Sequence, residues 1–176
     1  DEKKRSTDED AGAGMIGTVE FNSSTLYRYA TVDVDALQRN LGDVEATTRA
    51  ISAFIQAFVT SMPTGKQNTF ANRTLPDAVV VTVRDSQPIN LVGAFEDAVV
   101  TEGNHTRGEV AAIRLGERAA EIGACYGEVP VASWGLAVGP AKTGLERSWE
   151  GLEWTALPAL PAAVAEFAAA RLRDSQ

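Results

Sequence analysis

The sequence has 176 residues, of which 44% are hydrophobic and 23% are charged, the balance of an ordinary soluble globular domain. Twenty-four acidic and sixteen basic residues give a formal net charge of −8, and no apolar stretch approaches the roughly 18 residues needed to cross a bilayer. This composition argues against a membrane protein and against a domain that binds nucleic acid through its own net charge.

Cysteine content and the start of the chain indicate the compartment. Cys125 is the only cysteine, so the chain forms no internal disulfide. No basic, apolar and small-residue sequence of the secretory type stands at the N-terminus. We therefore expect a cytoplasmic protein in which Cys125 is a small buried core residue and not a nucleophile.

The first part of the chain predicts a strand followed by two helices. Residues 1–13 are charged and then glycine-rich, which is typical of a flexible loop inside a longer protein. The β-branched and aromatic residues of Thr18–Val34 favour a strand. Asp35 can cap a short helix that Gly42 ends, and apolar residues at helical spacing predict a second, buried helix over Val44–Met62.

The middle of the chain predicts a strand between helices. The apolar run Asp77–Arg84 favours a central strand that is covered on both faces. A helix is expected from Ser86 onward, because residues 91, 95 and 99 are apolar at helical spacing. A loop over Glu102–Gly108 and a helix over Glu109–Ala124 follow.

The last part of the chain completes an α+β domain. Alternation in Val129–Val138 predicts a strand, the stretch that follows up to Pro161 is expected to be irregular, and Pro161–Leu172 shows one apolar helix face. Helices packed on one face of a small sheet would leave the other sheet face available, as in RNA-recognition folds.

Two glycine-bearing loops match nucleotide-binding motifs only in part. Gly12–Gly17 has the spacing G-x-G-x-x-G, but a charged segment precedes it and a strand follows, whereas a dinucleotide site needs a strand before and a helix after. Thr60–Gln67 contains the Gly-Lys pair of a phosphate loop without its first glycine or its Ser/Thr. We therefore expect no cofactor and no ATPase site.

Candidate catalytic residues are few. His105 is the only histidine, and no cysteine or acidic pair lies beside it. No Cys/His spacing predicts a metal site. The three tryptophans are expected to anchor irregular chain on the core and not to stack bases. The residues taken alone indicate a protein that is not an enzyme.

Three segments resemble a known family. Met15–Asp43 reads MIGTVEFNSSTLYRYATVDVDALQRNLGD, with a Gly-Thr turn, EF-x-S, YRYA and an Asn-Leu-Gly helix end. Met62–Ala71 reads MPTGKQNTFA, and Pro76–Phe95 is an apolar strand that leads to Ala-Phe-Glu. Over roughly residues 14–100 the chain resembles the C-terminal half of CasC proteins, the RNA-binding backbone subunits of the type I-E CRISPR surveillance complex called Cascade.

The resemblance implies a division of the chain and a first RNA contact. Residues 14–20 would be the second strand of a thumb β-hairpin, and residues 21–176 the C-terminal part of a modified RNA-recognition, ferredoxin-like palm. The thumb crosses the RNA at intervals and displaces one base. The contacts implied there come from consecutive residues, with Ile16 as the apolar wedge: Met15, Ile16, Gly17 and Thr18. The alternative is that Ile16 is an ordinary strand residue.

A second implied contact lies in the loop after Met62. Lys66, Gln67 and Asn68 would contact guide-RNA phosphates, a contact that is independent of sequence; a solvated loop is the alternative. Arg28 either joins this surface or serves the core sheet through a carboxylate partner.

The resemblance also implies partners. These are CRISPR RNA, target DNA through the guide, further copies of the protein, other Cascade subunits and the N-terminal half of the same protein. Basic residues in that half would offset the charge of −8. A palm without it would leave a sheet edge and an apolar face uncovered.

Two other functions stay open. A CRISPR RNA-processing endonuclease of the related repeat-cleaving group would need His105 as its general base. A small-molecule enzyme would bind a nucleotide at Gly12–Gly17, and the nucleotide would then raise the melting temperature.

Overall fold

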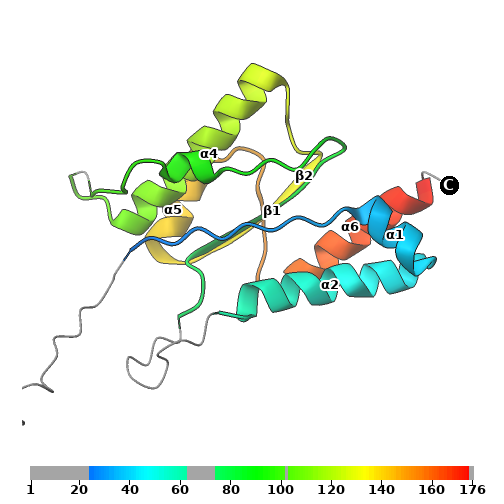
Figure 1. Cartoon of the computed structure of the whole chain (residues 1–176). Helices are drawn as coiled ribbons and strands as arrows, with labels where there is room; N and C mark the ends of the chain where they lie inside the picture. The colour runs from blue at the N-terminus through cyan, green and yellow to red at the C-terminus, as the bar shows by residue number, and fades with distance from the viewer. Residues whose placement is uncertain (1–23, 63–73, 102, 175–176) are drawn as a thin grey trace, which may run out of the picture.

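The computed structural model describes residues 24–62, 74–101 and 103–174 (Figure 1). The predicted contacts Met15–Thr18 and Lys66–Asn68 lie outside these ranges, as do the charged segment 1–13 and the thumb segment 14–20.

The described part of the chain is an α+β fold, as predicted. Its sheet has three strands in the order β1-β2-β3, with β1 antiparallel to β2 and β2 parallel to β3. The elements follow one another as α1 (Val34–Leu41), α2 (Val44–Thr60), β1 (Ala78–Val83), the short 3₁₀ helix η2 (Val92–Phe95), α4 (Arg107–Tyr126), β2 (Ala132–Ala137), α5 (Gly139–Ser148), β3 (Glu153–Trp154) and α6 (Leu160–Asp174).

Helices cover both faces of the sheet. Side chains alternate along β1, so Val79, Val81 and Val83 pack on one side against α2 and α6, whereas Ala78 and Val80 pack on the other side against α4 and α5. Figure 1 shows these two layers of helices above and below β1 and β2. The expectation of an open sheet face is therefore wrong.

The first core lies between the sheet, α2 and α6. Trp134 of β2 is only 4% exposed and its ring meets Phe167 edge-on, with 5.4 Å between the ring centres. The predicted apolar stripe of α2 is confirmed at Ile51 and Ile55, which are buried there. Phe54, which lies on the same helix, is 40% exposed.

The second core joins α4 and α5 to the other sheet face. Leu145 of α5 is completely buried. A Cβ on Gly144 would lie 2.6 Å from the Glu109 carbonyl oxygen, so the two helices approach each other too closely for any other residue. The stretch up to Pro161 was expected to be irregular, and this is wrong for α5 and β3, whereas residues 149–152 and 155–159 form no helix or strand, as expected.

Aspartate side chains cap the starts of α1 and α2. Asp33, and not Asp35, caps α1, because its Oδ1 accepts a hydrogen bond from the Ala36 N–H at 2.8 Å. Gly42 ends this helix in the left-handed conformation, as predicted. Asp43 caps α2 through the N–H groups of the following turn.

Three further predictions are wrong. Residues 24–33 form no strand. The helix expected from Ser86 is reduced to η2, because the Asn90 side chain accepts the Val92 N–H and Pro88 removes another donor. Cys125 is exposed near the end of α4 and not buried.

Within the described ranges, no helix is long and apolar enough to cross a membrane.

Candidate functional site

Arg28 lies at the C-terminal end of α2, beside Ser61 and Met62. Its Nη1 donates to the Ser61 carbonyl oxygen and to the Met62 sulfur, both at 3.3 Å. Its guanidinium carbon is 4.5 Å from the centre of the Phe58 ring, a cation–π arrangement. No carboxylate contacts Arg28 among the described residues, so the expected carboxylate partner is not found there.

Tyr27, the residue before Arg28, points to the other helix layer, where η2 lies. The Leu91 N–H donates to the Tyr27 hydroxyl oxygen at 3.2 Å, and the Tyr27 ring lies 5.2 Å from the Phe95 ring centre. Burial raises the pKa of Tyr27, and the hydrogen bond from Leu91 opposes this rise. Tyr27 and Arg28 thus hold the extended segment between η2 and the end of α2.

Met62 is the last described residue before the predicted contacts Lys66, Gln67 and Asn68, which lie outside the described ranges. Arg28, whose Nη1 contacts the Met62 sulfur, is exposed.

A second polar cluster ties β1 to the turn before β2. Arg84 donates to the Glu128 carbonyl oxygen at 2.8 Å, and the Ser86 hydroxyl donates to the Glu128 carboxylate. Burial lowers the pKa of Arg84, and the Glu128 carboxylate opposes this. Each of these polar groups has a partner within the fold, so the cluster is structural.

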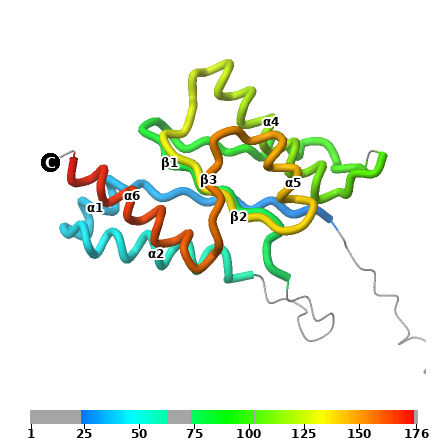
Figure 2. The backbone as a smooth tube through the Cα atoms, turned by 180° about the vertical axis from the view of Figure 1, so that it is seen from behind, coloured from blue at the N-terminus to red at the C-terminus, as the bar shows by residue number. Residues whose placement is uncertain are grey.

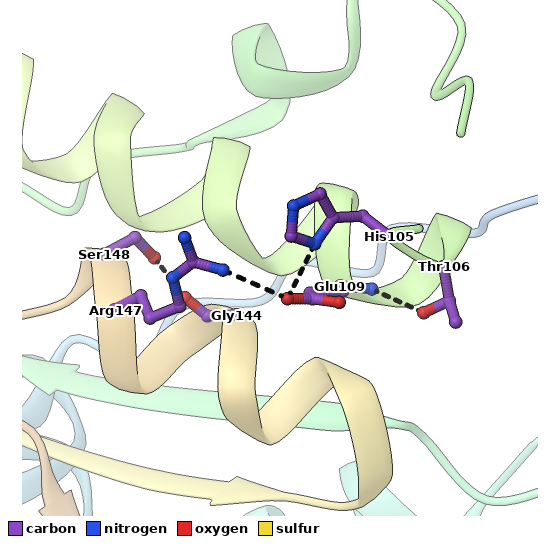
Figure 3. A network of polar contacts seen from close by, with 6 residues as sticks. All are labelled: His105, Thr106, Glu109, Gly144, Arg147 and Ser148. Carbon is purple, nitrogen blue, oxygen red and sulfur yellow. Dashed lines mark hydrogen bonds and ion pairs between the residues drawn. The ribbon is translucent and has the colours of Figure 1, made fainter. Parts of the chain in front are cut away.

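His105 belongs to a bridge between α4 and α5 (Figure 3). Its Nδ1 lies 3.0 Å from Glu109 Oε1, and the same oxygen lies 3.3 Å from Nη1 of Arg147. The Glu109 N–H is bonded to the Thr106 hydroxyl, which caps α4. The Glu109 carboxylate thus joins the start of α4 to the end of α5.

The bridge accounts for His105 as a residue that joins α4 to α5, because its Nδ1 and the Arg147 Nη1 both contact Oε1 of Glu109. Among the described residues, no group of three or more His, Cys, Asp or Glu side chains is suited to a metal ion.

The tryptophans serve packing. Trp134 is buried in the first core, and Trp149 packs against the second. Trp154 is 36% exposed, but the Lys142 ammonium lies 5.4 Å from its ring centre. The prediction that these residues anchor the chain is confirmed for Trp134 and Trp149.

Comparisons with known proteins agree with this fold. The family described as CT1975-like proteins matches residues 1–159. A chain of a solved "CRISPR RNA-guided surveillance complex" is 31% identical with a TM-score of 0.66, and the alignment covers 78% of this chain and 50% of that chain. A chain of a "CRISPR RNA-guided surveillance complex, pre-nicking" is 31% identical with a TM-score of 0.65, and the alignment covers 78% of this chain and 36% of that chain. No curated protein gives a significant match. The present chain thus spans half or less of the length of these two solved chains.

Proposed function

Because the chain belongs to the family of CT1975-like proteins, which are of the CasC type, we propose that it is part of the guide-RNA-binding backbone subunit of a type I-E CRISPR surveillance complex. The observation that carries the proposal is the family match over residues 1–159, together with a likeness in both sequence and fold to a chain of a CRISPR RNA-guided surveillance complex. Several copies would lie side by side along one CRISPR RNA and hold it for pairing with target DNA.

The end of α2 supplies the proposed phosphate-binding surface. Arg28 uses Nη1 for the contacts with Ser61 and Met62, so the other nitrogens of its guanidinium have no hydrogen-bond partner among the described residues. Lys66 follows Met62 by four positions in the sequence. Two cations with amide donors from Gln67 and Asn68 suit a sugar-phosphate backbone, which has the same charge whatever the base sequence.

The thumb residues supply the second proposed contact. A displaced base loses stacking, and an apolar side chain such as that of Ile16 replaces part of it without reading the base. Met15, Gly17 and Thr18 would surround Ile16. Such contacts accept any spacer sequence, as a guide-binding subunit requires.

The proposed role is binding and not catalysis. The endonuclease alternative is not favoured, because the solved chains that this chain resembles belong to CRISPR RNA-guided surveillance complexes. The proposed partners are the CRISPR RNA, target DNA through the guide, other copies and other Cascade subunits, in the cytoplasm.

Binding of a CRISPR RNA to the full-length protein over a series of salt concentrations tests the phosphate contact. Each phosphate contact to single-stranded RNA contributes about −0.7 to the slope of log affinity against log salt. We expect Lys66→Ala to weaken binding and to flatten this slope by about that amount. Arg173→Ala removes an exposed cation at the end of α6 and serves as the charge-matched control.

The two variants separate the outcomes. Loss confined to Lys66→Ala supports the proposed surface. Equal loss in both variants means that only the net charge matters, and an absence of RNA binding by the wild type contradicts the proposed function. Cleavage of the RNA that disappears in His105→Ala would support the endonuclease instead.

A further inference from the structure

We propose that the exposed ring of Phe54 on α2 is a stacking site for an unpaired base of the guide RNA, and that Arg28 holds a phosphate beside it. The inference rests on the proposed function and adds to it a contact with the face of a base. Phe54, Phe58 and Arg28 are together called the Phe54 patch.

The side chains of the Phe54 patch lie against one another. The rings of Phe54 and Phe58, which are one helical turn apart on α2, have centres 5.9 Å apart and planes inclined by 19°. The Arg28 guanidinium carbon lies 4.5 Å from the centre of the Phe58 ring. Phe58 is therefore partly covered by the cation, whereas Phe54 ends the row and is 40% exposed. A flat aromatic ligand can extend this row at Phe54.

The helix around Phe54 leaves room for such a ligand. Side chains three and four positions apart are neighbours on a helix. Apart from Phe58, the neighbours of Phe54 are Ile51, which is buried in the first core, and two alanines, Ala50 and Ala57. Because an alanine side chain is a single methyl group, no long side chain of α2 lies across the exposed ring.

The two segments that form the Phe54 patch lack acidic residues, although the chain has a formal net charge of −8. The sequence from Ala46 to Pro76 contains three basic residues and no acidic one. Residues 24–32 run alongside α2 in both views (Figures 1 and 2), and Arg28 is their only charged residue. An anionic chain is therefore repelled less here than by the acidic remainder of the sequence.

This combination of groups suits a nucleotide. An exposed aromatic ring stacks on any base, and a cation beside it pairs with phosphate, which binds single-stranded RNA without reading its sequence. The Ser61 carbonyl oxygen and the Met62 sulfur hold Nη1 of Arg28, so its remaining N–H groups are placed to donate to a phosphate. An apolar protein partner on Phe54 would supply no acceptor for those N–H groups.

Binding of a CRISPR RNA to the full-length protein over a series of salt concentrations separates stacking from charge. Stacking of one base on an aromatic side chain corresponds to about 5- to 150-fold in affinity. We expect Phe54→Ala to weaken binding by a factor in this range without changing the slope of log affinity against log salt. Phe54→Tyr keeps a stacking ring and should bind as the wild type does. Arg28→Ala should instead flatten the slope by about 0.7.

An exposed aromatic residue elsewhere supplies the matched control. Tyr126, at the end of α4, is 78% exposed, and Tyr126→Ala should leave both the affinity and the slope unchanged. Ultraviolet crosslinking of the wild-type complex, followed by peptide mapping, should find a nucleotide attached to Phe54 and none attached to Tyr126. This measurement uses the wild type, so it does not depend on how well a variant folds.

The outcomes distinguish the stacking site from the proposed function. Wild-type affinity in Phe54→Ala, or a wild-type complex with no nucleotide attached to Phe54, overturns the stacking site and leaves guide-RNA binding intact. A loss in Phe54→Ala that Phe54→Tyr does not restore also overturns it, because stacking requires only the ring. An absence of RNA binding by the wild type contradicts the proposed function itself.

Discussion

The guanidinium carbon of Arg28 lies 4.5 Å from the centre of the Phe58 ring, and the same side chain bonds the Ser61 carbonyl oxygen. One residue of the segment before α1 therefore fixes the last turn of α2, thirty-three positions away in the chain. The helix C-terminus, which is electrostatically negative, is a favourable place for this cation.

Arg28→Ala should loosen this connection. We expect the free energy of unfolding to fall by about 1 kcal/mol, the usual size of a partly exposed cation–π contact plus a hydrogen bond to a carbonyl oxygen. Arg28→Lys keeps the charge but not the planar fork, so an intermediate loss is expected in urea denaturation. Equal stability of all three proteins would show that the contact contributes nothing.

Thr47 is the one buried polar side chain of the described cores. Its hydroxyl lies 2.7 Å from Gln38 Oε1 and 2.9 Å from the Asp43 carbonyl oxygen, which joins α1 to α2. Thr47→Val keeps the shape but removes the hydroxyl donor from Gln38 Oε1, whereas the Asp43 carbonyl oxygen keeps the Thr47 N–H; the expected cost is about 1–3 kcal/mol.

Thr48→Val is the matched control for this change. The Thr48 hydroxyl bonds only the Val44 carbonyl oxygen of its own helix, so its loss should change stability by less than about 0.5 kcal/mol. Thermal or urea unfolding of the two variants side by side measures the difference. Equal losses would mean that the link between α1 and α2 is unimportant.

Substitution by alanine should lower the free energy of unfolding at Gly144 and raise it at Gly108. A Cβ on Gly144 would meet the Glu109 carbonyl oxygen at 2.6 Å and the Ala112 Cβ at 2.8 Å, so α4 and α5 must separate. We expect Gly144→Ala to cost about 1–3 kcal/mol. No atom lies within 4 Å of a Cβ on Gly108 in α4, and Gly108→Ala should gain up to about 1 kcal/mol in denaturation experiments. A neutral Gly144→Ala would contradict the close helix contact.

Ionisation of Tyr27 should lower the stability of the folded protein at high pH. Burial raises its pKa in the folded state, so its contribution to stability is complete below the ordinary tyrosine pKa of about 10 and is lost as pH rises through the higher folded-state pKa. Tyr27→Phe lacks this ionisation.

The comparison is the free energy of unfolding of wild type and Tyr27→Phe from about pH 9 to about pH 11. The wild type should be the more stable at the lower pH, because phenylalanine leaves the Leu91 N–H without its acceptor. Its advantage should shrink as pH rises. A constant difference would show that Tyr27 ionises as freely in the folded protein as in the unfolded chain.

The sequence predicted the elements whose pattern is local. The repeat of apolar residues located α2 and α6, the β-branched run located β1 and the alternation in Val129–Val138 located β2, because these patterns result directly from burial of one helix face or one strand. The CasC resemblance was recognised from ordered motifs in residues 14–100, and the family match confirms it.

The wrong predictions depend on contacts that no local pattern contains. Gly139, Pro140 and Gly144 suggested irregular chain, yet proline is tolerated in a first helical turn and Gly144 is needed where α4 approaches. Residues 24–33 have strand composition, but a strand needs a neighbouring backbone, which the described residues do not supply. The proposed RNA contacts came from the resemblance and lie outside the described residues, so they stay predictions.

The most direct test of the central claim counts the copies of full-length protein on CRISPR RNAs of increasing length, by mass photometry. A backbone subunit predicts that the number of copies rises in proportion to RNA length, that Ile16→Leu preserves this and that Ile16→Asp abolishes it, because a charge cannot replace base stacking. One bound copy at every RNA length, or no binding at all, would contradict the backbone function.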